Sequence, residues 1–186
     1  MEKIGFYFGK FIDLLIEMPF LVVLVIIIIA IAIIAQWALY EKASQPGVSC
    51  LVPGWNFVSF MKIVGRPTWH AVFVILPLTI LFAVGIVFID DFATLIKSGF
   101  STAGDMIFPL TLFAASLITL GIFMANVYVE LCNSFGKFST SDYVLILLFN
   151  GFYVFNLGLS YKEKYYGPAY HKTKDEVIEM GALNAA

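Results

Sequence analysis

Charged residues are scarce in this sequence. Only 13% of its 186 residues are Asp, Glu, Lys or Arg, whereas 61% are hydrophobic. An ordinary soluble domain has about 25% charged and roughly 45–50% apolar residues. A soluble fold of this length could not bury so much apolar surface, because a small domain has a high ratio of surface to volume. The composition therefore excludes an ordinary soluble domain and indicates an integral membrane protein whose main partner is the lipid bilayer.

Cysteine and histidine are also scarce, and the chain has no net positive charge. The chain has only two cysteines, Cys50 and Cys132, and two histidines, His70 and His171. They form no CxxC motif and no pair of histidines four residues apart, so the spacing predicts neither a metal site nor a bound cofactor. The net charge of -2 gives no basic surface that could release counterions from phosphates, which argues against nucleic acid as a partner.

The first 18 residues are predicted to form an amphipathic helix that does not cross the membrane. On a helical wheel their charged residues occupy about one third of the circumference, and apolar residues cover the rest. Such a helix lies in the membrane interface or packs against a partner protein. The apolar run that follows is longer than the ~7–15 residues of a signal-peptide core, so we interpret it as a retained anchor.

Four hydrophobic segments are predicted to cross the membrane, within an all-α transmembrane domain over residues 19–161. About 20 helical residues cross a hydrocarbon core of ~30 Å. The expected spans are residues 20–40, 69–89, 107–132 and 143–161. The first has no charge and ends with Trp37 and Tyr40, which are typical of the interface. The fourth is the shortest and contains Asn150 and Gly151.

The connecting segments differ in character. Residues 49–65 are apolar but interrupted by Pro53 and Gly54. They either span, re-enter or lie at the interface; we favour the last two, because irregular backbone at membrane depth needs protein or water around it. Residues 90–106 are expected to form the main exposed loop, and residues 162–186 a mobile polar tail. In a four-span topology, the positive-inside rule favours both termini in the cytoplasm.

Polar residues inside the hydrophobic segments are the candidate functional groups, because a polar side chain in lipid is costly unless it is hydrogen-bonded. They are Asn56, Asn126, Glu130, Asn150 and Asn156. The asparagines are predicted to bond between helices of this chain or to a helix of a partner subunit. Glu130 is interpreted either as an interface-level carboxylate that pairs with Lys or Arg, or as a proton- or ion-binding site.

Ser59 and Lys62 are the only pair that suggests catalysis. They are three residues apart and could lie on one helix face as a serine nucleophile and a lysine base. The surrounding residues match no catalytic motif, and a lysine that extends to the interface accounts for Lys62. We therefore expect no catalytic site and no enzymatic activity.

Two stretches carry a resemblance to a known family. The first includes Pro46-Gly47, Leu51-Val52-Pro53, Lys62-Ile63-Val64-Gly65-Arg66-Pro67 and Trp69; the second includes Ser134-Phe135-Gly136-Lys137, Leu147-Leu148-Phe149 and Tyr165-Tyr166-Gly167-Pro168. Together they resemble an uncharacterised family of small bacterial multi-pass membrane proteins, also found as N-terminal extensions of signal peptidase I. The chain departs from the pattern at Phe149, where relatives tend to have proline.

The resemblance covers roughly residues 40–170 and implies a location in the bacterial inner membrane near protein export, with no catalytic residues to transfer. The resulting hypothesis is a non-enzymatic accessory or scaffold subunit of a larger membrane complex, which acts in protein export or processing. The alternative is a small transporter or channel that uses Glu130 and the intramembrane asparagines.

Overall fold

The structure is a computed structural model that describes residues 17–88 and 107–184, and every regular element in those ranges is a helix. Three helical segments are long and apolar enough to cross a membrane: α2 (Pro19–Lys42), η2 with α4 (Thr68–Val87) and α6 (Ile107–Ser134). Within the second segment, the 3-10 turn η2 (Thr68–Ala71) leads directly into α4 (Val72–Val87). Nearly all of the predicted N-terminal amphipathic helix, and the whole loop at 90–106, lie outside the described residues.

The first three predicted spans agree with these helices to within two residues at each end. α2 begins at Pro19, a position that suits proline. Backbone N–H groups in the first turn have no acceptor within the helix, so the missing N–H of proline costs no hydrogen bond there. Pro109 occupies the same kind of position near the start of α6. Pro77 lies inside α4, and the helix continues through it. The apolar runs therefore determine these three helices well.

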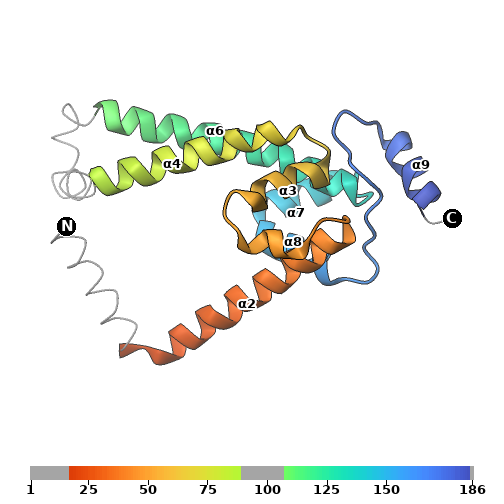
Figure 1. The fold of residues 1–186 in the computed structure, drawn as a ribbon, viewed down its shortest axis with the longest axis horizontal. Coiled ribbons are helices and arrows are strands. Elements are labelled where there is room, and N and C mark those ends of the chain that lie inside the picture. The colour runs from red at the N-terminus through yellow and green to blue at the C-terminus, as the bar shows by residue number, and fades with distance from the viewer. Residues whose placement is uncertain (1–16, 89–106, 185–186) are drawn as a thin grey trace.

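α4 and α6 pack side by side as a long antiparallel hairpin (Figure 1). α2 contacts the rest of the protein near its C-terminal end, where Ala35, Leu39 and Tyr40 are buried. Toward its N-terminal end it diverges from the hairpin (Figure 1). Nearly all of its side chains from Phe20 to Ile34 are exposed.

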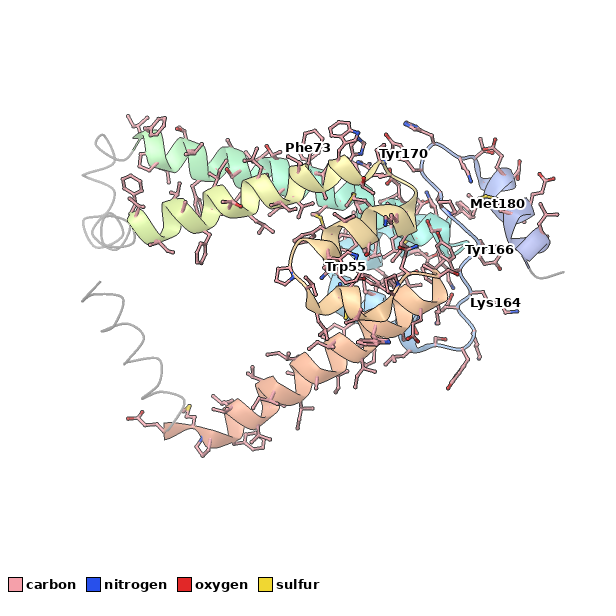
Figure 2. All side chains as sticks on the ribbon, in the orientation of Figure 1. Trp55, Phe73, Lys164, Tyr166, Tyr170 and Met180 are labelled. Carbon is pink, nitrogen blue, oxygen red and sulfur yellow. The ribbon has the colours of Figure 1, made fainter. Side chains whose placement is uncertain are left out.

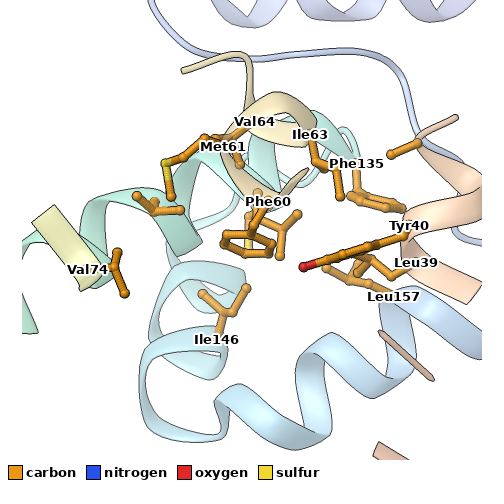
Figure 3. Packing of buried hydrophobic residues seen from close by; sticks show 14 of the residues in the cluster. Leu39, Tyr40, Phe60, Met61, Ile63, Val64, Val74, Phe135, Ile146 and Leu157 are labelled. Atoms are coloured by element: carbon orange, nitrogen blue, oxygen red, sulfur yellow. The ribbon is translucent and has the colours of Figure 1, made fainter. Parts of the chain in front are cut away.

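The hydrophobic core lies at one end of the three spans. Here the C-terminal ends of α2 and α6 and the N-terminal end of α4 meet four short helices: η1 (Gly47–Leu51), α3 (Trp55–Val64), α7 (Thr140–Leu148) and α8 (Asn150–Leu159). We call this assembly the head. Its fully buried side chains include Leu39, Tyr40, Met61, Val64, Val74, Leu131, Ile146 and Leu157 (Figure 3). The predicted interfacial or re-entrant segment thus contributes α3, whose ten residues extend about 15 Å, too short to cross.

The fourth predicted span differs from the structure. In place of one continuous helix over residues 143–161, α7 and α8 are two helices bent by 114° relative to each other. The chain breaks at Phe149, directly before Asn150 and Gly151, two residues with low helix propensity. Together the two helices are long and apolar enough for one span, so the described chain has three segments that could cross a membrane, or up to four.

The tail predicted for residues 162–186 contacts the rest of the structure at several points within residues 162–184. The backbone N–H of Tyr166 donates to the carbonyl of Ser134 (2.8 Å), and that of Tyr170 donates to the carbonyl of Val64 (2.9 Å). Ser134 and Val64 are the last residues of α6 and α3, whose terminal carbonyls have no partner within the helix. The segment binds to the head for this reason and then forms α9 (Lys174–Asn184), where Met180 lies near Tyr166 (Figure 2).

Candidate functional site

The most concentrated polar interaction in the described chain joins Arg66, between α3 and η2, to Glu130 near the end of α6. The Arg66 Nε donates to Glu130 Oε2 at 2.6 Å, and an Arg66 terminal nitrogen donates to Oε1 at 2.7 Å. Only 11% of the Arg66 side chain and 18% of the Glu130 side chain are exposed. Two parallel charge-assisted hydrogen bonds of this kind are strong and fix the relative orientation of both groups.

Aromatic rings enclose the Arg66 guanidinium. Its central carbon lies 4.9 Å from the centre of the Phe123 ring and 5.0 Å from that of Tyr170, so both rings contact the cation. The His70 ring lies edge-on to the same two rings, at 6.3 and 6.0 Å. Figure 2 shows Phe73 and Tyr170 together at the head end of α4. The bond from Glu130 raises the pKa of Arg66, so the guanidinium stays charged.

Gly65 places Arg66 in this position. It ends α3 with φ of +87°, a left-handed conformation that favours glycine. The Arg66 N–H then donates to the carbonyl of Met61 at 2.8 Å, as in a Schellman cap. A Cβ on Gly65 would lie 2.6 Å from the Cβ of Pro168, so the close approach of the C-terminal segment also requires glycine.

A second polar cluster joins α2, η1 and α3 around Asn56. The Tyr40 hydroxyl donates to the Asn56 side chain and is 3.1 Å from its backbone carbonyl. Gln36 Nε2 donates to Asn56 Oδ1 at 3.3 Å, and Asn56 Nδ2 donates to the carbonyl of Cys50 at 3.3 Å. Asn56 of α3 is therefore hydrogen-bonded to both α2 and η1.

The other predicted polar residues have separate environments. Asn150, at the start of α8, lies close to the Tyr128 hydroxyl of α6. Asn126 is exposed and donates to the carbonyl of Ile122 in its own helix at 3.0 Å, and Asn156 is exposed on α8. Glu130 pairs with an arginine, as its first interpretation predicts. The structure therefore does not gather the five candidates into one site.

Ser59 and Lys62 do not form a dyad. Ser59 is fully buried, with no hydrogen-bond partner for its hydroxyl, whereas Lys62 is exposed. Cys50 and Cys132 are free thiols. Within residues 17–88 and 107–184, no group of three or more His, Cys, Asp or Glu is placed to hold a metal ion.

Two lysine contacts were not predicted from the sequence. The Lys42 ammonium donates to the carbonyls of Leu157 and Ser160, both at 2.7 Å, and thereby joins the end of α2 to the end of α8. Lys137 forms an ion pair of 2.9 Å with Glu163, which raises the pKa of Lys137. The partners are separated by up to 118 residues along the chain, so no local spacing reveals them.

The two stretches that carry the family resemblance pack against each other in the head. Gly65 lies against Pro168, and Gly136, with φ of +71°, lies against the ring of Tyr166. The Tyr165 hydroxyl donates to the carbonyl of Ile63 at 2.6 Å. The resembling residues thus contribute to one packed unit, with the Arg66–Glu130 pair inside it. Comparison of the chain with models of protein families, with curated proteins and with solved structures finds no match.

Proposed function

We propose that this chain is a non-enzymatic accessory or scaffold subunit of a larger membrane complex, with its head as the rigid part and α2 as the helix that contacts other subunits. α2 supports this proposal most directly. Its residues from Phe20 to Ile34 have almost no cover from α4 or α6, so a long apolar surface is free to meet a helix of another subunit. A bacterial inner-membrane location and a setting in protein export rest on the family resemblance of residues 40–170.

The geometry of Glu130 favours a scaffold over a transporter. A carboxylate that carries protons or ions through a membrane must be able to exchange its partner. Both oxygens of Glu130 instead accept hydrogen bonds from Arg66, which two aromatic rings hold in place. This arrangement is suited to holding α6 against the loop between α3 and η2, and hence to keeping the head rigid.

Site-specific photo-crosslinking in the native membrane tests the proposal. A photoreactive amino acid at Ile26 or Ile34, both on exposed faces of α2, is expected to give discrete protein adducts. The same group at Phe82 of α4, which is more exposed than either, serves as the matched control and should give mainly lipid adducts. If Ile26, Ile34 and Phe82 all give only lipid adducts, a role for α2 in subunit contact is contradicted.

The Glu130→Gln variant distinguishes a scaffold from a carrier. A scaffold keeps its α2 crosslinks, since the substituted residue lies in the head and not on α2. Proteoliposomes that contain a pH-sensitive dye provide the opposite readout. A proton flux that depends on the wild-type protein and stops with Glu130→Gln would support the transporter and overturn the scaffold.

A further inference from the structure

We propose that α7 and α8 form a re-entrant hairpin that enters and leaves the membrane on the head side, with the bend between them docked among the acyl chains of a single leaflet. The described chain then crosses the membrane three times. This inference concerns the placement of α7 and α8 and holds whichever subunit binds α2.

The lengths of the two helices fit half a membrane. α7 has nine residues and α8 has ten, so each extends about 14–15 Å, roughly half of a ~30 Å hydrocarbon core. A bend of 114° between them turns the second helix away from the direction of the first. The one charged residue of the two helices is Asp142, in the first turn of α7 at the head end of the hairpin, where its Oδ1 accepts a hydrogen bond from the Tyr153 hydroxyl at 2.6 Å. No charged residue occurs from Tyr143 to Tyr161, so the rest of the hairpin is compatible with lipid.

The contact between Asn150 and Tyr128 gives the depth of the bend. Asn150 is the first residue of α8, and its partner Tyr128 lies six residues before Ser134, the last residue of α6. Six helical residues correspond to about 9 Å along the axis of α6. The bend therefore reaches only the outer part of the span, and α6 continues for about 30 Å beyond it, from Val127 back to Ile107.

Both ends of the hairpin are attached on the head side. At its start, the Tyr143 hydroxyl donates to Asn133 Oδ1 at 2.6 Å, next to the end of α6. At its end, the two bonds from Lys42 hold Leu157 and Ser160 at the end of α2. Six residues after Ser160, the Tyr166 N–H bonds to Ser134. A fourth crossing would instead carry this segment to the far ends of α2 and α6.

The bend carries an apolar surface that acyl chains would cover. Leu148, Phe149 and Phe152 are 72%, 55% and 82% exposed. The backbone N–H groups of Phe149 and Tyr153 donate within the hairpin to Leu145 and Phe149, as backbone in lipid requires. Asn150 lies close to Tyr128 of α6, and the three exposed large side chains at the bend carry no hydrogen-bonding group that a polar partner would need.

Three crossings also change the expected orientation. The head and C-terminal segment then share one side and carry eight of the 11 Lys and Arg residues: Lys42, Lys62, Arg66, Lys137, Lys162, Lys164, Lys172 and Lys174. Only Lys3, Lys10 and Lys97 belong to the segments that precede α2 or join α4 to α6. The positive-inside rule then places the head and the C-terminus in the cytoplasm. The four-span prediction placed both termini there, whereas three crossings place the N-terminus on the opposite side.

Cysteine labelling tests the sidedness. In a Cys50→Ala parent, whose remaining Cys132 is fully buried, single cysteines replace Lys62, Lys164 or Ser98. A membrane-impermeant maleimide is expected to label Lys62→Cys and Lys164→Cys in inverted vesicles, and Ser98→Cys in spheroplasts. Labelling of Lys164→Cys from the Ser98 side would overturn the re-entrant hairpin. If Lys62→Cys and Lys164→Cys both react only in spheroplasts, the cytoplasmic orientation is overturned.

A spin label on Phe152→Cys, in the same parent and reconstituted in phosphatidylcholine–phosphatidylglycerol vesicles, tests the lipid contact. We expect high accessibility to oxygen, low accessibility to a water-soluble nickel chelate, and a depth within one leaflet. A label at Phe82→Cys on α4 gives the lipid-exposed reference. Low accessibility to both reagents would mean that protein covers the bend, and high accessibility to nickel would mean that water does. Either result, or a depth at the bilayer midplane, overturns the proposal.

Discussion

Gly158 of α8 lies directly against the backbone carbonyl of Ala35 in α2, so close that a Cβ on Gly158 would overlap the carbonyl oxygen. This contact sets the spacing of the two helices. Gly158→Ala is expected to separate them and destabilise the protein by about 1–3 kcal/mol. Gly151→Ala is the matched control, because its Cβ would meet no atom within 4 Å. Thermal unfolding in detergent measures both; equal melting temperatures for the two variants would contradict the close packing.

Removal of the Lys42 ammonium should loosen the end of α8. Lys42→Met keeps the apolar part of the side chain but loses the two bonds to Leu157 and Ser160, at a cost of about 1–2 kcal/mol. Hydrogen exchange should increase at residues 156–160. The same substitution at Lys62, which is exposed on α3, should change neither property. Unchanged exchange in Lys42→Met would show that these bonds do not hold α8.

The Arg66–Glu130 pair should behave as a unit. Arg66→Leu or Glu130→Leu alone leaves an unpaired charge in a largely buried site and is expected to cost about 2–3 kcal/mol. The double substitution removes both charges and should cost less than the sum of the single changes. Thermal melts of the four proteins form the double-mutant cycle. Additive losses would mean that the two side chains do not interact.

Tyr165 should make the protein sensitive to alkali. Burial raises the pKa of Tyr165 to about 12, whereas an unfolded tyrosine ionises near 10. The folded state therefore keeps its proton while the unfolded state loses one, and stability falls as the pH rises from about 10 to 12. Tyr165→Phe should show a shallower loss over that range, measured by detergent melts at each pH. Equal pH dependence in both proteins would contradict the burial of this hydroxyl.

The sequence was sufficient for the three spans because each is a long apolar run bounded by proline, aromatic or polar residues. It was also sufficient to single out Glu130 and Asn56 as polar groups that need partners, which the structure supplies as Arg66 and as residues of α2 and η1. These predictions depend on the free-energy cost of placing a polar group in lipid without a hydrogen-bond partner. That cost follows from the residue type alone and needs no knowledge of the fold.

The remaining features depend on long-range packing. Arg66 and Glu130 are 64 residues apart, and no local pattern identifies one as the partner of the other. The break at Phe149 depends partly on Asn150 meeting Tyr128 of another helix. The C-terminal segment is polar in composition, yet it binds the head because α3 and α6 end with carbonyls that need donors. Composition alone therefore predicted a free tail.

Among the described residues, α2 is attached to the rest of the protein only near its C-terminal end, by Ala35, Leu39, Tyr40 and Lys42. Its tilt can therefore change without any repacking of the α4–α6 hairpin. A helix adapts to a thinner or thicker bilayer mainly by tilting, at a modest cost for each ångström of mismatch. The protein should consequently tolerate membranes of different thickness, because α2 and the hairpin adjust their hydrophobic lengths independently.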